Sequence, residues 1–161
     1  RGAGFSMSDA TFVMQWHVLG MFVPSFFTGH LIARLGIIRL LLTGAAVLAA
    51  SALTAMGGTT LTHFWVALVM LGIGWNFLFV GGSTLLTQTH GAAERGLVQG
   101  INDLAVFSLV ALGSLLAGVL LHHLGWALLN FAMLPLIILA AMATLWLRFQ
   151  PATPTDSEAV R

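Results

Sequence analysis

Residues 40–56 read LLLTGAAVLAASALTAM and residues 61–88 read LTHFWVALVMLGIGWNFLFVGGSTLLTQ. Neither stretch contains Asp, Glu, Lys or Arg, and only Gly57-Gly58-Thr59-Thr60 separates them. A helix needs about 20 apolar residues to cross a bilayer core of roughly 30 Å. The two stretches therefore predict two membrane-spanning helices that are joined by a short, glycine-containing turn.

The same segregation of charge extends through the rest of the chain. Charged residues make up 7% of the sequence and hydrophobic residues 58%, with a mean hydropathy of +0.98. A soluble domain has roughly a quarter charged residues. Uncharged stretches also run from Asp9 to Arg34, long enough for one span, and from Asp103 to Arg148, long enough for two. We therefore predict an all-α, polytopic membrane helix bundle of about five transmembrane helices.

The expected spans divide the chain into a transmembrane part, residues 1–147, and a tail, residues 148–161. The tail contains two prolines and two acids and is predicted to be disordered. Pro24 lies inside the first span, where the loss of a backbone hydrogen bond predicts a kink. The predicted helices cover approximately residues 10–33, 40–56, 61–88, 97–121 and 127–147.

Basic residues mark the cytoplasmic connections of membrane proteins, and here they occupy alternate connections. Every basic residue except Arg1 falls on one side, at Arg34, Arg39, Arg95, Arg148 and Arg161. The opposite connections, residues 57–60 and 122–126, contain no Lys or Arg. This distribution predicts a multi-pass protein with a cytoplasmic C-terminus, which we expect in the cell inner membrane.

Three segments resemble the major facilitator superfamily of transporters. Residues 29–39, GHLIARLGIIR, are similar to the Gly-x-Leu-x-Asp-Arg-x-Gly-x-Arg-type signature of that family, which recurs in weaker form between helices eight and nine. Residues 72–82, GIGWNFLFVGG, look like a tenth helix, and residues 94–100, ERGLVQG, like the loop that enters an eleventh. The resemblance covers nearly the whole chain.

The resemblance implies a partial major-facilitator-type fold of helices eight to twelve, the C-terminal half of a protein whose N-terminal half is missing. Gly29, Arg34, Gly36 and Arg39 would then be the residues of the conformational-motif turn. Ala33 stands where the family has its Asp, so the contact attributed to that carboxylate cannot form here. The resemblance further implies a secondary transporter of a small molecule that works by alternating access, with H⁺ as the coupling ion.

Two ionisable residues are candidates for the substrate or proton pathway, because a charge at the bilayer centre costs about 2.5–3.5 kcal/mol. Asp103 is the only acid predicted within a span; it either couples transport to an ion or interacts locally with the first turns of its helix. His17 lies inside the first span. It either relays protons, since histidine titrates near physiological pH, or hydrogen-bonds to a neighbouring helix.

Uncharged polar residues supply further candidates for the same pathway. Asn76, Ser83 and Thr84 are offset by seven and eight residues, so they form one polar stripe along the third predicted helix. Lipid does not solvate such a stripe, which therefore faces protein or a water-filled cavity. Gln15 is a candidate of the same kind in the first span.

Other classes of function find less support in the residues. We find no nucleophile beside a base, no paired carboxylates and no histidine pair at helical metal-site spacing, so we predict neither an enzyme nor a bound metal or cofactor. A basic patch for nucleic acid is also absent from the sequence. The expected partners are a small-molecule substrate, H⁺, membrane lipid and the missing half. A non-transporting membrane scaffold or assembly protein is the alternative.

Overall fold

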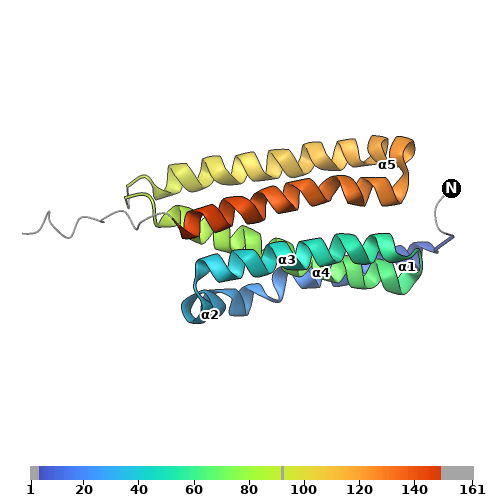
Figure 1. The fold of residues 1–161 in the computed structure, drawn as a ribbon, viewed down its shortest axis with the longest axis horizontal. Coiled ribbons are helices and arrows are strands. Elements are labelled where there is room, and N and C mark those ends of the chain that lie inside the picture. The colour runs from blue at the N-terminus through green and yellow to red at the C-terminus, as the bar shows by residue number, and fades with distance from the viewer. Residues whose placement is uncertain (1–3, 92, 150–161) are drawn as a thin grey trace, which may run out of the picture.

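A computed structural model describes residues 4–91 and 93–149 of the chain. These residues form five helical elements and no strand, which confirms the predicted all-α class. The long helices run side by side along one axis of the molecule (Figure 1). Most of the tail for which disorder was predicted, residues 150–161, lies outside the described residues.

The first predicted span is broken in two at Pro24. Helix α1, Met7–Phe22, starts with a capping box in which the Ser6 hydroxyl accepts from the Asp9 amide and the Asp9 carboxylate accepts from the Ser6 amide. Helix α2, Ser25–Leu35, follows Pro24, and the two axes are bent by 42°. The kink expected from the missing proline N–H thus takes the form of a helix break.

One glycine reverses the chain between α2 and α3. Helix α3, Ile37–Gly57, begins directly after Gly36, whose φ of 84° and ψ of 152° lie in a region that only glycine adopts readily. Helix α4, Leu61–Thr87, starts at Thr60, whose hydroxyl accepts from the His63 amide. The two helices are slightly shifted from the ranges expected from hydropathy.

Helix α5, Arg95–Arg148, contains the fourth and fifth predicted spans. Gly125, with φ 74° and ψ 172°, interrupts it and divides it into an N-terminal leg, residues 95–124, and a C-terminal leg, residues 126–148. Figure 1 shows the ribbon turning back on itself at this end of α5. A connection was expected over residues 122–126, but helical backbone continues up to the single glycine on both sides.

The described helices are long enough to span a membrane. Helices α3, α4 and α5 each have the length and hydropathy of a membrane span, and the bent pair α1 and α2 together forms a further candidate. Each leg of α5 exceeds the roughly 20 residues that one crossing needs. With the legs counted separately, the architecture agrees with about five spans.

Helix α4 packs closely against both α1 and α3, because glycines line its contacts. A Cβ atom at Gly72 would lie 2.5 Å from the carbonyl oxygen of His17 in α1, and one at Gly74 would lie 3.0 Å from the carbonyl oxygen of Gly44 in α3. Such small residues allow helix backbones to approach in a membrane. The C-terminal leg of α5 joins this core through the Trp126 indole, which donates to the Ala55 carbonyl at 2.7 Å.

The glycine contact between α4 and α1 gives a direct test of this packing. We expect Gly72→Ala to lower the free energy of unfolding by about 1–3 kcal/mol, because the new methyl group overlaps the backbone of α1. The measurement is thermal unfolding of the purified, detergent-solubilised protein. Gly82→Ala is the matched control, since the space beside Gly82 in the same helix is open. Equal effects of the two substitutions would contradict this packing.

Candidate functional site

Asn76 is the most completely hydrogen-bonded polar side chain in the described part of the chain, and only 3% of it is exposed. Its Oδ1 accepts from the Thr28 hydroxyl at 2.7 Å. Its Nδ2 donates to the Met21 carbonyl at 2.7 Å and also to the Ser25 hydroxyl. We call these four residues, Met21, Ser25, Thr28 and Asn76, the Asn76 node.

The Asn76 node supplies a hydrogen bond to the backbone at the helix break. Because the helix breaks after Phe22, the Met21 carbonyl does not receive the bond from the Ser25 amide that a continuous helix would give it. An unpaired carbonyl inside a bilayer costs several kcal/mol, and the Asn76 amide pairs with it from α4. In this structure the carboxamide that was predicted to meet substrate holds α4 against the break between α1 and α2.

His17 and Gln15 lie two residues apart in α1 and have different environments. His17 is half-buried, and its Nδ1 lies 2.8 Å from the Leu68 carbonyl of α4. A carbonyl only accepts, so Nδ1 carries the hydrogen and Nε2 is the ring atom that remains for another partner. Gln15 is exposed and borders an open groove of about 670 Å³, whose lining residues are Ala10, Thr11, Met14, Gln15, Val18 and Leu19.

A second polar group joins α4 to the N-terminal leg of α5. The Gln99 amide donates to the Ser83 hydroxyl at 3.3 Å and to Asp103 Oδ1 at 2.9 Å. The Asn102 amide donates to the same carboxylate oxygen at 3.2 Å. We call Ser83, Gln99, Asn102 and Asp103 the Asp103 cluster; all four side chains are half-buried.

The Asp103 cluster holds a carboxylate with neutral donors. Both groups that donate to Asp103 in the described residues are amides, and Oδ2 receives neither of these bonds. Gln99 Oε1 is buried and has no hydrogen-bond partner among the described residues. The cluster therefore contains one carboxylate oxygen that neither amide reaches and one buried amide oxygen without a partner.

The polar stripe of α4 meets different neighbours along its length. Asn76 faces α1 and α2, whereas Ser83 contacts α5. Thr84 donates to the Val80 carbonyl of its own helix at 2.7 Å. The structure thus brings Ser83 and Asp103 together and keeps Asn76 in a separate node. Gln99 was not predicted as a site residue, although its position four residues before Asp103 is a helical-pair signal.

Three aromatic rings extend the contact between α4 and α5 towards the middle of the helices. Trp75 and Phe79 stack with ring centroids 5.9 Å apart and planes 10° apart. Phe79 also meets Phe107 of α5 at 5.9 Å and 54°. We call Trp75, Phe79 and Phe107 the aromatic stack. Helical spacing of four residues places it beside the Asp103 cluster, since Ser83 follows Phe79 and Asp103 precedes Phe107 by one turn.

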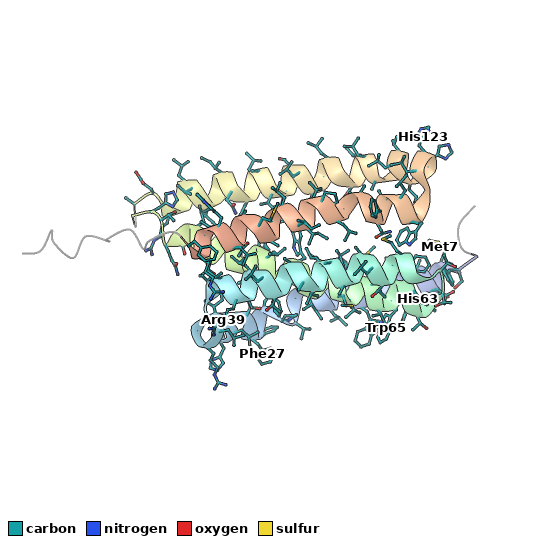
Figure 2. All side chains as sticks on the ribbon, in the orientation of Figure 1. Met7, Phe27, Arg39, His63, Trp65 and His123 are labelled. Carbon is teal, nitrogen blue, oxygen red and sulfur yellow. The ribbon has the colours of Figure 1, made fainter. Side chains whose placement is uncertain are left out.

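The conformational-motif turn lies at one end of the molecule. Figure 2 shows Arg39 at the end opposite His63 and His123. The side chains of Arg34 and Arg39 are exposed, the space beside Gly29 is open, and Gly36 has the positive φ described above. Among the residues that the structure describes, no group of three or more His, Cys, Asp or Glu side chains could hold a metal ion.

Comparison with known proteins gives a consistent family assignment. A family model described as Major Facilitator Superfamily matches residues 2–161. The chain is 47% identical over 150 residues to the riboflavin transporter RfnT of Brucella anthropi, an alignment that covers 93% of this chain and 37% of RfnT. No solved structure matches the chain significantly.

Two Bacillus subtilis proteins, both named as uncharacterized transporters of the same superfamily, are more distant relatives. The chain is 29% identical to YddS over 89% of its own length and 33% of YddS. It is 30% identical to YdeG over 74% of its own length and 28% of YdeG. The chain thus spans about a third of the length of the curated relatives that it matches.

The Asn76 node predicts a coupling between α4 and the helix break. We expect Asn76→Leu to lower the free energy of unfolding by about 1–3 kcal/mol, because the Met21 carbonyl keeps only the long 3.5 Å bond from the Ser25 hydroxyl. Adding Pro24→Ala should recover part of this loss, since a continuous helix would let the Ser25 amide pair with that carbonyl. Thermal unfolding in detergent measures both effects.

Asn130→Leu is the matched control for this pair of substitutions. Among the described residues, the Asn130 side-chain amide donates only to the Trp126 carbonyl of its own helix. Its loss therefore does not leave a backbone carbonyl at the α1–α2 break without a partner. We expect a smaller loss and no recovery on addition of Pro24→Ala. Equal behaviour of Asn76→Leu and Asn130→Leu would show that the node does not support the break.

Proposed function

The chain belongs to the major facilitator superfamily, and we propose that it is the C-terminal part of a secondary transporter that moves a small molecule by alternating access. The family and the named relatives are transporters and not enzymes, and the long apolar helices are those of a multi-pass membrane protein. In this proposal, residues 1–147 belong to the C-terminal transmembrane half, and the N-terminal half of the same protein completes the substrate pathway.

The proposed substrate is riboflavin or a closely similar flavin. The support is the 47% identity to the riboflavin transporter RfnT across 93% of the chain. The aromatic stack is compatible with this substrate, because planar rings bind well against aromatic side chains. The direction of transport follows from neither observation, so both uptake and efflux are measured below.

The observation that carries the proposed coupling to H⁺ is the environment of Asp103. This acid lies eight residues after Arg95, roughly 12 Å along the helix axis, and accepts from two neutral amides of its own helix. One of them, the Gln99 amide, also donates to Ser83 of α4. Protonation at Oδ2 would neutralise the carboxylate and weaken the bond that it accepts from Gln99. The link from Asp103 through Gln99 to Ser83 would then loosen as the proton binds.

The other predicted residues have supporting roles in this proposal. His17 passes protons through Nε2 while Nδ1 stays bonded to α4, and Gln15 lies on the groove through which substrate or water approaches. Asn76 acts as a positioning residue that keeps the broken helix in place, and Thr84 lines the pathway beside Ser83.

The conformational-motif turn, with Gly29, Arg34, Gly36 and Arg39, supports a proposed orientation. In this proposal, this end of the helices lies in the cytoplasm together with the C-terminal tail, residues 148–161, and the arginines of the turn support that orientation. We further propose the cell inner membrane as the location, with lipid around the exposed apolar side chains of the C-terminal leg of α5.

Flux measurements on the full-length transporter test this function. We expect the wild type to move radiolabelled riboflavin across the membrane faster when a proton gradient is imposed. Asp103→Asn should lower this proton-dependent flux at least tenfold, a loss equivalent to about 1.4 kcal/mol, because an amide cannot bind and release the proton. Uptake and efflux are followed in membrane vesicles at matched transporter abundance.

Glu94→Gln is the control, since Glu94 is an exposed acid at the start of the same helix and makes no capping hydrogen bond. It should retain wild-type flux. If the wild-type transporter moves neither riboflavin nor any compound of a wider panel across the membrane, the transporter proposal is wrong and the scaffold alternative is favoured. If Asp103→Asn keeps full proton dependence, the coupling residue lies elsewhere.

A further inference from the structure

The aromatic stack and the Asp103 cluster form one continuous surface between α4 and the N-terminal leg of α5. On α4, Trp75, Phe79 and Ser83 follow one another at intervals of four residues; on α5, Gln99, Asp103 and Phe107 do the same. Ser83 meets Gln99 at one end, and Phe79, one turn away on α4, meets Phe107, about two turns away on α5. Aromatic rings and hydrogen-bonding groups therefore adjoin each other.

The rings of this surface are accessible to a ligand. Phe107 is 57% exposed, and the rings of Phe79 and Phe107 are tilted by 54° instead of being stacked face to face. The rings therefore do not bury one another completely. A planar molecule can lie against them and gain the contact that the side chains leave unused.

The polar end of the surface has an unused acceptor next to a donor. Gln99 Oε1 is buried without a partner among the described residues, which is costly for an amide oxygen. Ser83 accepts from Gln99, and this leaves the Ser83 hydroxyl proton to donate. One acceptor and one donor on adjacent side chains match the edge of a heteroaromatic ring that carries an N–H beside a C=O.

We propose that this surface binds the flavin ring of the substrate. The ring lies against Phe79 and Phe107. The Gln99 side chain turns so that its buried Oε1 reaches the ring edge and accepts from N3–H, and the adjacent ring carbonyl accepts from Ser83. Gln99 and Phe107 thereby become specificity residues for a planar heteroaromatic ligand with an N–H donor. This inference rests on the flavin substrate proposed above, and its test distinguishes a failure of the site from a failure of the transport proposal.

Binding to the full-length transporter tests the site. Riboflavin and 3-methylriboflavin, which carries a methyl group in place of the N3 hydrogen, are titrated against purified transporter, and quenching of flavin fluorescence reports binding. We expect the wild type to prefer riboflavin by about tenfold, because the methylated ring cannot donate to Gln99. Gln99→Met should remove this preference, and Gln99→Asn, with a shorter amide, should retain part of it.

Phe107→Leu tests the aromatic contact. It should lower the affinity for both ligands about fivefold to tenfold without changing the preference between them, since it removes a ring and keeps an apolar side chain. Phe131→Leu is the matched control, because Phe131 lies in the other leg of α5 with a similar exposure of 55%. It should bind both ligands as the wild type does.

The outcomes separate the site from the transport proposal. Riboflavin transport by the wild type, with an unchanged preference in Gln99→Met or unchanged affinity in Phe107→Leu, would overturn the site and leave the function intact. Flavin binding that depends on Gln99 and Phe107, without riboflavin transport, would support the site and overturn the proposed transport. Absence of any flavin binding to the wild type would overturn the site.

Discussion

Hydrocarbon offers no hydrogen-bond partner to a polypeptide, so every backbone group that leaves a helix inside a membrane must be paired by the protein itself. In this chain the requirement is concentrated at Pro24. The Asn76 side chain meets it from α4, and the close glycine contacts between α4 and α1 bring it within reach. The shape of the broken helix and the packing of α4 therefore depend on one buried carboxamide.

The same helix serves a second purpose near its other end. An offset of seven residues puts Asn76 and Ser83 on nearly the same face of α4, but their neighbours differ. The hydrogen-bonding groups of Asn76 are occupied by partners in α1 and α2. Ser83 belongs to a looser contact with α5, in which Gln99 keeps an unused oxygen and Phe107 an exposed ring. The support of the helix break and the proposed ligand contact are thus separated along one stripe of α4.

Much of the architecture could be predicted from the sequence, because the gaps between charges directly report the lengths that a bilayer requires. Tertiary partners could not be predicted in this way. The bond between Ser83 and Gln99 joins two helices, and hydropathy contains no information on which helices face each other. The reversal at Gly125 lies inside the connection expected over residues 122–126, although the backbone of His122 and His123 is still helical.

Single glycines make two of the chain reversals, at Gly36 and Gly125. Neither reversal has a loop that could accept extra residues without disturbing a helix end. Epitope tags or protease sites for mapping membrane topology therefore belong in other connections, such as residues 58–60 and 88–91, where helical structure is interrupted for longer. At the two glycine reversals, the side chains of the flanking helix turns would hinder the access of a labelling reagent.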